Sequence, residues 1–508
     1  MYYPSFDLFR EKSKEGNLIP VYREILADLE TPVSAFLKID KGEYSFLLES
    51  VEGGEKWARY CFLGVEPSIV FMSKGKEIRI IRDGDVEEFT VDKDPLDSLK
   101  RLMSEYRYVE TEGIPRFFGG AVGYIGYDII RFFEELPEKA KDDLKIPDSV
   151  FIITDTILIF DNVTQKIKIV SNAHITDGNL QDIYNNAKEK IDSIILRLKE
   201  PLRRDIAIKG VKGDNKRRDV LKTTSNISRE GFEKVVLRSK RYIRDGDIIQ
   251  VVLSQRLKTR INGDPFNIYR ALRTINPSPY MYYLKLGDMN IIGSSPEVLV
   301  RLDRGQVELR PIAGTRRRGA TESEDIKLAE ELLNDSKEKA EHIMLVDLGR
   351  NDLGRVAKIK SVEVNELMVI ERYSHVMHIV SNIRGDIEEG LDCFDVIRAT
   401  FPAGTVSGAP KIRAMEIIEE LEPTRRGLYA GAVGYFSFSG NMDMAIAIRT
   451  IIIKDKTAYL GIGAGIVADS KPANEYEETM NKGKALLKAI EMAERYLGEV
   501  YDIDDRQL

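Results

Sequence analysis

The sequence predicts an α+β fold in which large antiparallel β-sheets form a sandwich flanked by helices. Short apolar runs of strand length fill most of the chain before residue 172, and helical patterns occur in blocks instead of alternating regularly with strands. Three long strand-like runs lie close to the C-terminus, between residues 429 and 468. A chain of 508 residues is long enough to bury more than one core, so at least two domains are expected.

The clearest domain boundary is a change in composition. Residues 199–219, KEPLRRDIAIKGVKGDNKRRD, are basic, poor in large apolar side chains and interrupted by one proline and two glycines. Such a composition is typical of a linker or a solvated loop. We therefore expect an N-terminal domain at 1–198, a linker at 199–225 and a second domain at 226–490.

In the N-terminal domain, the apolar pattern predicts antiparallel strands. Residues 77–91 alternate on either side of Asp83-Gly84, which indicates a hairpin, and residues 151–170 indicate a second hairpin. Helical spacing predicts helices at 95–106 and 179–198. Further strand-like runs are AFLKI at 35–39, YSFLLESV at 44–51 and SIVFM at 68–72.

The second domain combines a long series of strands with separate helices. Ser228 is expected to cap a helix that ends at Asp245-Gly246. Further helices are predicted at 323–348 and 472–497. The predicted strands are residues 247–261, 280–286, 290–295, 297–303, 307–313, 376–387, 429–438, 442–455 and 457–468.

Composition and charge exclude several classes of function. A net charge of −7 gives no general affinity for polyanions, so nucleic acid is not an expected partner. The two cysteines, Cys61 and Cys393, cannot form a disulfide framework, which favours a reducing compartment. The first residues lack the pattern of a signal peptide, and no apolar run is long enough for a membrane span. We expect a cytoplasmic protein with no membrane partner.

The stretch FPAGTVSGAPK, residues 401–411, is similar to a phosphate-binding loop but has the wrong spacing. A P-loop needs a lysine directly after its second glycine, whereas Lys411 follows Gly408 by three residues. Pro410 also removes one amide that could point at a phosphate. Together with PIAGTRRRG at 311–319 and the arginine within the apolar run 444–453, this loop suggests a site for a small molecule with several negative charges.

Two helices carry acidic residues that could hold a metal. Glu341 lies in the front half of one helix, whereas Glu475, Glu478 and Lys482 share one face of the last helix. Two carboxylates from separate helices suit Mg²⁺, although an acidic helix face is more often simply a solvated surface. In the first helix, ion pairs are expected that join Asp347 and Asp352 to Arg350 and Arg355.

Two histidines lie on one predicted strand of alternating character. His375 and His378 are three residues apart, so they are expected to face opposite sides of the sheet. A histidine on a strand is more often a satisfied core residue than a catalyst. His378 lies among apolar neighbours, where it could also act as a general acid or base near neutral pH.

Taken together, these motifs resemble component I of anthranilate synthase, in the chorismate-utilising enzyme family. The resemblance extends over essentially the whole chain, and the motifs occur in the family's order. They are LLES (47–50), NPSPYM (276–281), GSSPE (293–297), PIAGTRRRG, EHIMLVDLGRNDLGRV, VMHIVS, FPAGTVSGAPK, GLYAGAVGY, AIAIRT, GIGAGIVADS and EYEETMNKGKA.

The resemblance implies a Mg²⁺-dependent conversion of chorismate and ammonia to anthranilate and pyruvate, the first committed step of tryptophan biosynthesis. Glu341 and Glu478 would hold Mg²⁺, with Glu475 close by. His378 would act as the acid or base, assisted by Thr405 and Lys482. The residues that would line the chorismate site are Gly314, Thr315, Tyr429, Arg449, Gly463, Ala464 and Gly465.

Two positions separate the related reactions of this family. Relatives that activate water carry a lysine base where this chain has Gln250, and a glutamine cannot take up the proton. Aminodeoxychorismate synthases typically carry a nucleophilic lysine where this chain has Ala313. Both positions favour attack by ammonia. The alternatives are aminodeoxychorismate synthase component I and a non-catalytic metabolite-binding regulator.

LLES and NPSPYM resemble the tryptophan feedback site of the family. Ser50 would contact the amino-acid end of the inhibitor, and Pro279, Tyr280 and Met281 would form its pocket. The alternative is ordinary strand packing. The N-terminal domain would then be regulatory and would pack on the catalytic, chorismate-binding domain.

The sequence contains no glutamine amidotransferase signature. Neither Cys61 nor Cys393 lies in a Gly-x-Cys-x-Gly turn. Ammonia would therefore come from solution or from glutamine through a separate amidotransferase subunit, component II, which the family pattern places with component I in a heterotetramer.

Overall fold

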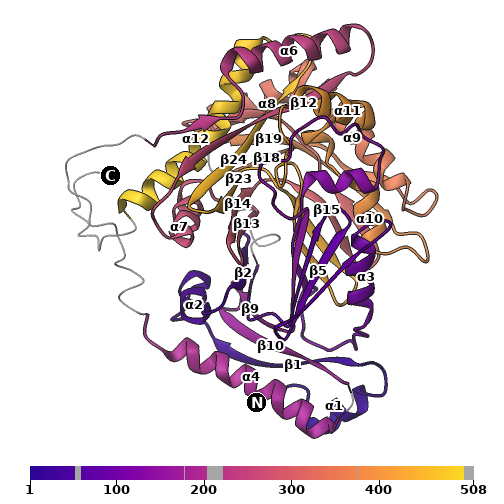
Figure 1. Ribbon diagram of the computed structural model, residues 1–508, viewed down its shortest axis with the longest axis vertical. Helices are drawn as coiled ribbons and strands as arrows, with labels where there is room; N and C mark the ends of the chain where they lie inside the picture. Colours follow the sequence, from indigo (N-terminus) through magenta and orange to yellow (C-terminus); the bar gives the residue numbers. More distant parts are fainter. Residues whose placement is uncertain (52–58, 177, 203–220, 374–375, 497–508) are drawn as a thin grey trace.

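The computed structural model describes residues 1–51, 59–176, 178–202, 221–373 and 376–496. Figure 1 shows two large β-sheets with helices on their outer sides. Each sheet has 12 strands, and the pairings between these strands are antiparallel. The predicted α+β fold is confirmed.

The first sheet is built from strands of both halves of the chain. Its central path has the following order: β1 (Leu18–Leu26), β10 (Lys166–His174), β9 (Thr156–Asp161), β3 (Tyr60–Val65), β2 (Tyr44–Glu49), β13 (Tyr280–Leu286), β14 (Met289–Ser295), β23 (Thr450–Lys454), β24 (Thr457–Ile466), β12 (Gln250–Arg260) and β11 (Thr224–Ser225). The short strand β20 (Gly408–Ala409) also pairs with β12.

The second sheet has the same mixed origin. Its order is β17 (Ile312–Arg317), β19 (Val376–Asp386), β16 (Gln306–Leu309), β15 (Val298–Asp303), β22 (Met442–Ile446), β21 (Ala432–Ser437), β7 (Gly120–Ile125), β8 (Ser149–Thr154), β4 (Ile69–Lys74), β5 (Glu77–Arg82) and β6 (Asp85–Thr90). Strand β18 (Glu363–Arg372) pairs with β19.

The main core lies between the sheets. Phe46 and Phe62 of the first sheet and Val122 and Phe151 of the second belong to one buried cluster. Leu47, next to Phe46, faces the other way and joins a second cluster under the helices. This alternation follows from the two-residue period of a strand.

Helices cover the outer faces. The helices packed on the first sheet are α1 (Phe6–Lys12), α2 (Pro32–Ile39), α4 (Leu180–Lys199), α7 (Pro265–Ile275) and α12 (Pro472–Tyr496). Helices α6 (Arg229–Arg244) and α11 (Lys411–Leu421) pack on β12. The second sheet carries α3 (Leu96–Ser104), α8 (Glu322–Asn334), α9 (Ser336–Gly354) and α10 (Cys393–Thr400), and the 3₁₀ turns η1 (Tyr127–Phe132) and η2 (Gly404–Val406) complete the fold.

The hydrogen bonding runs without interruption across the predicted domain boundary. In the first sheet β2 pairs with β13, and in the second β7 pairs with β21. The pentapeptide GAVGY occurs at 120–124 in β7 and at 431–435, where all but its first residue belongs to β21, and the two copies pair with Gly123 opposite Gly434. A Cβ at Gly120 of β7 would lie 2.1 Å from the carbonyl oxygen of Phe436 in β21, so these two backbones approach too closely for a side chain.

Two strands predicted as continuous instead divide between the sheets. Within residues 151–160, β8 ends at Thr154 in the second sheet and β9 begins at Thr156 in the first sheet. Only β9 and β10 form the predicted hairpin. The run 442–455 divides in the same way between β22 and β23. Periodicity does not reveal such a crossing because the flanking segments are apolar and buried in both sheets.

Two other predictions need correction. The run AFLKI belongs to α2, because Thr31 caps the helix in a capping box with Ser34, and Pro32 fits its first turn. The single helix predicted at 323–348 is two helices, because Asp335 ends α8 and accepts hydrogen bonds from the first amides of α9. The Ser228 cap of α6 is confirmed.

Among the described residues, none of the helices combines the length and the apolar character that crossing a bilayer requires.

Candidate active site

His378 lies on β19, opposite a bulge in the neighbouring strand β17. Its Nδ1 is 3.0 Å from the carbonyl oxygen of Gly314 and 3.1 Å from the hydroxyl of Thr315. Gly314 has φ of +63°, a conformation that favours glycine. The bulge thus turns the Gly314 carbonyl toward the imidazole.

These contacts determine the protonation of His378. Burial lowers its pKa, the charge of Arg449 lowers it further, and the hydrogen bond to Gly314 opposes both effects. The ring is therefore neutral at pH 7. Because a carbonyl oxygen only accepts, the proton lies on Nδ1, and Nε2 keeps a lone pair that can take up a proton.

Arg449 lies where the chain crosses from one sheet to the other. β22 ends at Ile446 and β23 begins at Thr450, and Arg449 between them has φ of +48°. Its carbonyl oxygen accepts a hydrogen bond of 3.1 Å from the Ser294 amide. A strained backbone at a crossover is one way to hold a functional side chain in place.

Glu297 is a functional candidate that the sequence analysis missed. Its side chain is 7% exposed, and burial raises its pKa to about 8 against the opposing effects of Thr405, Arg449 and Lys482. The carboxyl group therefore holds its proton at neutral pH. The available signal was a glutamate directly before the apolar strand β15, within the motif GSSPE.

Thr405, in the loop 401–411, lies next to the Glu297 carboxyl group. The Thr405 hydroxyl is buried and lies close enough to lower the pKa of Glu297, but it completes no hydrogen bond of good geometry with the described residues. Lys411 is bound to Asp352 at 2.7 Å, so it serves the fold and not an anion. The predicted ion pair of Asp352 with an arginine is therefore wrong, because Asp352 pairs with Lys411. The predicted ion pair of Asp347 with Arg350 is confirmed, at 3.1 Å.

The glycines of β24 make room for Tyr429. A Cβ at Gly461 would lie 2.3 Å from Cγ of the tyrosine ring, and one at Gly463 would lie 2.4 Å from its hydroxyl oxygen. Lys482 donates to the Gly463 carbonyl at 3.0 Å and pairs with Glu478 at 2.8 Å. Four predicted site residues on β24, α12 and the loop before β21 are thereby brought together.

Gln250 connects β12 to α9. Its Nε2 donates to Glu341 Oε1 at 2.9 Å, whereas its Oε1 is buried and has no hydrogen-bond partner among the described residues. A Cβ at Gly465 would lie 2.7 Å from that Nε2. The amide is therefore held in one orientation with a free acceptor.

Each of the two predicted metal ligands, Glu341 and Glu478, lies close to a second carboxylate on its own helix. Burial and the charge of Glu341 raise the pKa of Glu338, and burial and the charge of Glu478 raise the pKa of Glu475. Lys337 of α9 acts on Glu475 of α12, so the first turns of the two helices lie near each other. No group of three or more possible ligands encloses a metal site among the described residues. Two carboxylates suffice for Mg²⁺, so this oxygen-only set fits it.

The two motifs predicted to form the tryptophan site lie side by side. Met281 of β13 is paired with Glu49 of β2, and the amide of Val51 donates to the Ser278 carbonyl at 3.2 Å. LLES and NPSPYM, far apart in sequence, are thus neighbours in the first sheet. His375 lies outside the described residues, so its predicted orientation stays a prediction.

A pocket lies beside Tyr429. It is lined mainly by β12, β23, β24 and residues 422–429, and it shares only Tyr429 with the predicted chorismate contacts. His378, Glu341 and Glu478 do not line it. Apart from this pocket, the residues that act on one another around the imidazole form the His378 cluster: Glu297, Gly314, Thr315, His378, Thr405 and Arg449.

Comparison with known proteins decides the family. Residues 46–488 match a family model described as chorismate binding enzyme. The chain belongs to the chorismate-binding enzyme family.

Within this family, the chain is similar to proteins named anthranilate synthase component 1. It is 54% identical over 493 residues to that of Acetivibrio thermocellus, which covers 97% of this chain and 99% of the relative. It is 52% identical over 491 residues to that of Aquifex aeolicus (strain VF5), with 96% and 98% covered. The predicted resemblance to anthranilate synthase component I is confirmed.

Solved structures of family members share the fold. Anthranilate synthase component I from Streptococcus pneumoniae TIGR4 matches with a TM-score of 0.73 and 38% identity, over 91% of this chain and 99% of that chain. The menaquinone-specific isochorismate synthase of Escherichia coli matches with a TM-score of 0.68 over 95% and 98%, and at 19% identity it shows the fold alone.

Proposed function

We propose that this chorismate-binding enzyme converts chorismate and ammonia to anthranilate, pyruvate and water. The observation that carries the proposal is that Arg449 acts electrostatically on both His378, a neutral base, and Glu297, a protonated acid. A cation that acts on both a base and an acid in a buried site suits a reaction that moves protons at two points of an anionic ring.

The substrate would be bound by a charged side chain and by backbone groups. The Arg449 guanidinium would face a substrate carboxylate, and the glycines of β24 would let the substrate approach the backbone beside Tyr429. Glu341 and Glu478 would hold Mg²⁺, which supplies positive charge to the ring carboxylate when bound. Glu475 would lie close by as a second carboxylate, whose pKa the charge of Glu478 raises.

The nucleophile would be ammonia because neither of the two positions that separate the related reactions supplies a competing group. Ala313 carries no amine, and Gln250 cannot take a proton from water. Gln250 Oε1 is a buried acceptor without a partner among the described residues, so it suits an N–H group of incoming ammonia. This argument weighs against aminodeoxychorismate synthase and against a water-adding relative.

The proton transfers would follow from the two protonation states. Ammonia forms a C–N bond to the ring as the C–O bond to the allylic hydroxyl breaks, and that hydroxyl takes the Glu297 proton and leaves as water. The new ammonium group then gives one proton back to the Glu297 carboxylate. His378 Nε2 then removes the proton from the aminated ring carbon. The C–O bond to the enolpyruvyl group breaks, that group takes up the proton held by His378 to become pyruvate, and the ring becomes aromatic as anthranilate.

Glu478→Gln tests the proposal. Anthranilate fluorescence would be followed with chorismate, ammonium and Mg²⁺, and the variant is expected to lose Mg²⁺-dependent turnover while remaining folded. Glu477→Gln is the matched control, since Glu477 is an exposed neighbour on the same helix that pairs with Arg229. Unchanged turnover in Glu478→Gln would remove this residue from the metal site, and a product other than anthranilate from the unmodified chain would refute the reaction.

We further propose that tryptophan inhibits the enzyme at Ser50, Pro279, Tyr280 and Met281. Asn276, in the same NPSPYM motif, donates to the Ser294 hydroxyl at 2.9 Å, and the Ser294 amide donates to the Arg449 carbonyl at 3.1 Å. This short path would let a ligand at the N-terminal half act on the catalytic arginine. Residues 1–198 would accordingly be the regulatory region, 226–490 the catalytic region and 199–225 the linker.

The partner we propose is a glutamine amidotransferase subunit, assembled with this chain in a heterotetramer. Burial raises the pKa of both Cys61 and Cys393 to about 12, so neither thiol can act as a glutaminase nucleophile. The relatives are named as a component 1, which agrees with a second component. The isolated chain is expected to use ammonium but not glutamine, and glutamine-dependent activity of the pure chain would contradict the proposal.

A further inference from the structure

A buried ion pair with no role in the proposed chemistry lies directly behind the site. Glu422, at the end of α11, and Arg426 have side chains that are 6% and 2% exposed. Removing two charges from water is costly, and such a pair often contributes little net stability. Its presence next to the site therefore calls for another explanation.

The contacts of Arg426 connect three separate segments. Its guanidinium donates to Glu422 at 3.0 and 2.6 Å, to the Val406 carbonyl at 2.7 Å and to the Val252 carbonyl at 2.7 Å. Glu422 in turn accepts from the amide and hydroxyl of Ser254, at 2.8 and 3.0 Å. The pair thus joins the end of α11 to β12 and to the loop 401–411.

Each of these segments carries a residue of the proposed site. Val406 follows Thr405, Val252 is two residues beyond Gln250 on β12, and the Arg426 guanidinium carbon lies 5.7 Å from the centre of the Tyr429 ring. Only a planar fork with several donors can reach two carbonyl oxygens and a carboxylate at once, so a lysine would not replace this arginine.

We propose that Glu422 and Arg426 are positioning residues that hold Thr405, Gln250 and Tyr429 in one arrangement. This inference rests on the proposed function, because it takes these three residues to be part of the active site. The ion pair lines the neighbouring pocket together with Tyr429, and we assign it no contact with the substrate. It acts through the two carbonyl oxygens and the ring that it holds, and a displacement of about 1 Å costs a catalytic site roughly 100-fold in rate.

The test replaces the pair by apolar side chains of similar size. The double variant Glu422→Leu/Arg426→Met leaves no charge unpaired, but it removes hydrogen bonds to the Val406 and Val252 carbonyls and to the Ser254 amide, so it is expected to lower the thermal midpoint while the chain still folds. Its kcat is expected to fall at least tenfold, with a smaller change in the KM for chorismate. Arg426→Lys is expected to lose activity in the same way although it keeps the charge.

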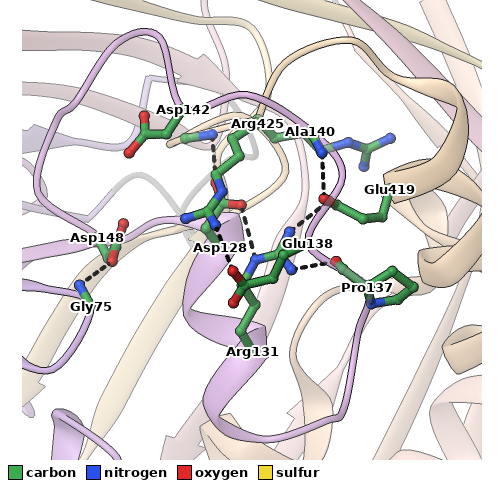
Figure 2. Close-up of polar contacts among 12 residues, drawn as sticks. Gly75, Asp128, Arg131, Pro137, Glu138, Ala140, Asp142, Asp148, Glu419 and Arg425 are labelled. Atoms are coloured by element: carbon green, nitrogen blue, oxygen red, sulfur yellow. Dashed lines mark hydrogen bonds and ion pairs between the residues drawn. The ribbon is translucent and has the colours of Figure 1, made fainter.

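A second buried pair, formed by Glu419 of α11 and Arg131 of η1, provides the control. Arg131 and Glu419, shown in Figure 2, have side chains that are 12% and 7% exposed and lie 2.5 Å apart. Glu419 also accepts from the Ala140 amide at 2.7 Å, so this pair holds the segment 137–140 and none of the site residues. Glu419→Leu/Arg131→Met is expected to lower stability but to leave kcat unchanged in the folded protein.

Amide hydrogen exchange provides a readout that does not depend on the reaction. Exchange at Val406 and Ser407 is expected to quicken in the Glu422/Arg426 variants and to stay unchanged in the control. Unchanged exchange there, or a kcat within twofold of the unmodified chain, overturns the inference. If the double variant does not fold, Arg426→Lys decides by the same two measurements. If the unmodified chain forms no anthranilate, the proposed function fails, while hydrogen exchange still decides the positioning role.

Discussion

Glu297 retains a proton that a carboxyl group in water would have lost at pH 7. With a pKa of about 8, it can donate to a leaving hydroxyl across the neutral range. Glu297→Gln keeps the shape but removes the proton, so kcat is expected to fall by about 100- to 10,000-fold. Steady-state kinetics on the folded variant tests this, and loss of less than tenfold would contradict an acid role.

The same residue makes a prediction about stability. The folded state holds this proton up to about pH 8, whereas the unfolded chain releases it near the ordinary value of 4.5, so the stability of the unmodified protein falls as pH rises between them. The glutamine has no proton to lose. Glu297→Gln is therefore expected to gain stability relative to the unmodified chain as pH rises toward 8, measured by denaturant unfolding at pH 5, 7 and 9. Parallel curves for the two proteins would show that the carboxyl group is not buried as described.

His378 shifts the pH profile in the opposite direction. Burial and Arg449 lower its pKa, so it remains a neutral base at pH values where an exposed histidine would be half protonated. The acid limb of kcat/KM is expected to lie below about 6.5, the ordinary histidine value, and to disappear in His378→Ala along with most of the activity. An acid limb retained in the variant would assign that limb to another group.

At the scale of elements, the pairing of β21 with β22 depends on glycine. A Cβ at Gly434 would lie 2.0 Å from the Asp443 carbonyl oxygen, and backbone cannot move aside. Gly434→Ala is expected to cost about 3 kcal/mol, seen as a lower midpoint of unfolding. Gly440→Ala is the control: its φ is +80° and nothing lies within 4 Å, so only the conformational cost of about 1–2 kcal/mol applies. Equal losses in the two variants would show that close packing is not the cause.

What the sequence predicts at this scale depends on whether the signal is local. The caps of α6 and the hairpin of β5 and β6 follow from residues a few positions apart, and both are present. The crossings near residues 155 and 449 do not follow from nearby residues, because pairing with distant segments determines which sheet an apolar strand joins. The role of Glu297 was missed for the same reason, since its pKa depends on burial by the rest of the chain.

At the scale of the whole molecule, the two halves meet through hydrogen-bonded strands, and the proposed inhibitor site lies on that junction. Ser50→Phe is expected to relieve inhibition by tryptophan with little loss of activity, because Ser50 directly follows β2, beside β13, while the His378 cluster lies elsewhere. The measurement is anthranilate formation with increasing tryptophan. Inhibition that persists in the variant would place the regulatory site in another part of the protein.

The shared sheets also determine how this chain is made. On the ribosome β7 is complete at Ile125, but its partner β21 begins only at Ala432. At about 5–20 residues per second, the growing polypeptide waits on the order of tens of seconds with the open edge of β7 unmatched. The nascent N-terminal half is therefore a natural client for chaperones, and a translation product that stops before Ala432 would be left with an edge that nothing in its own sequence can cover.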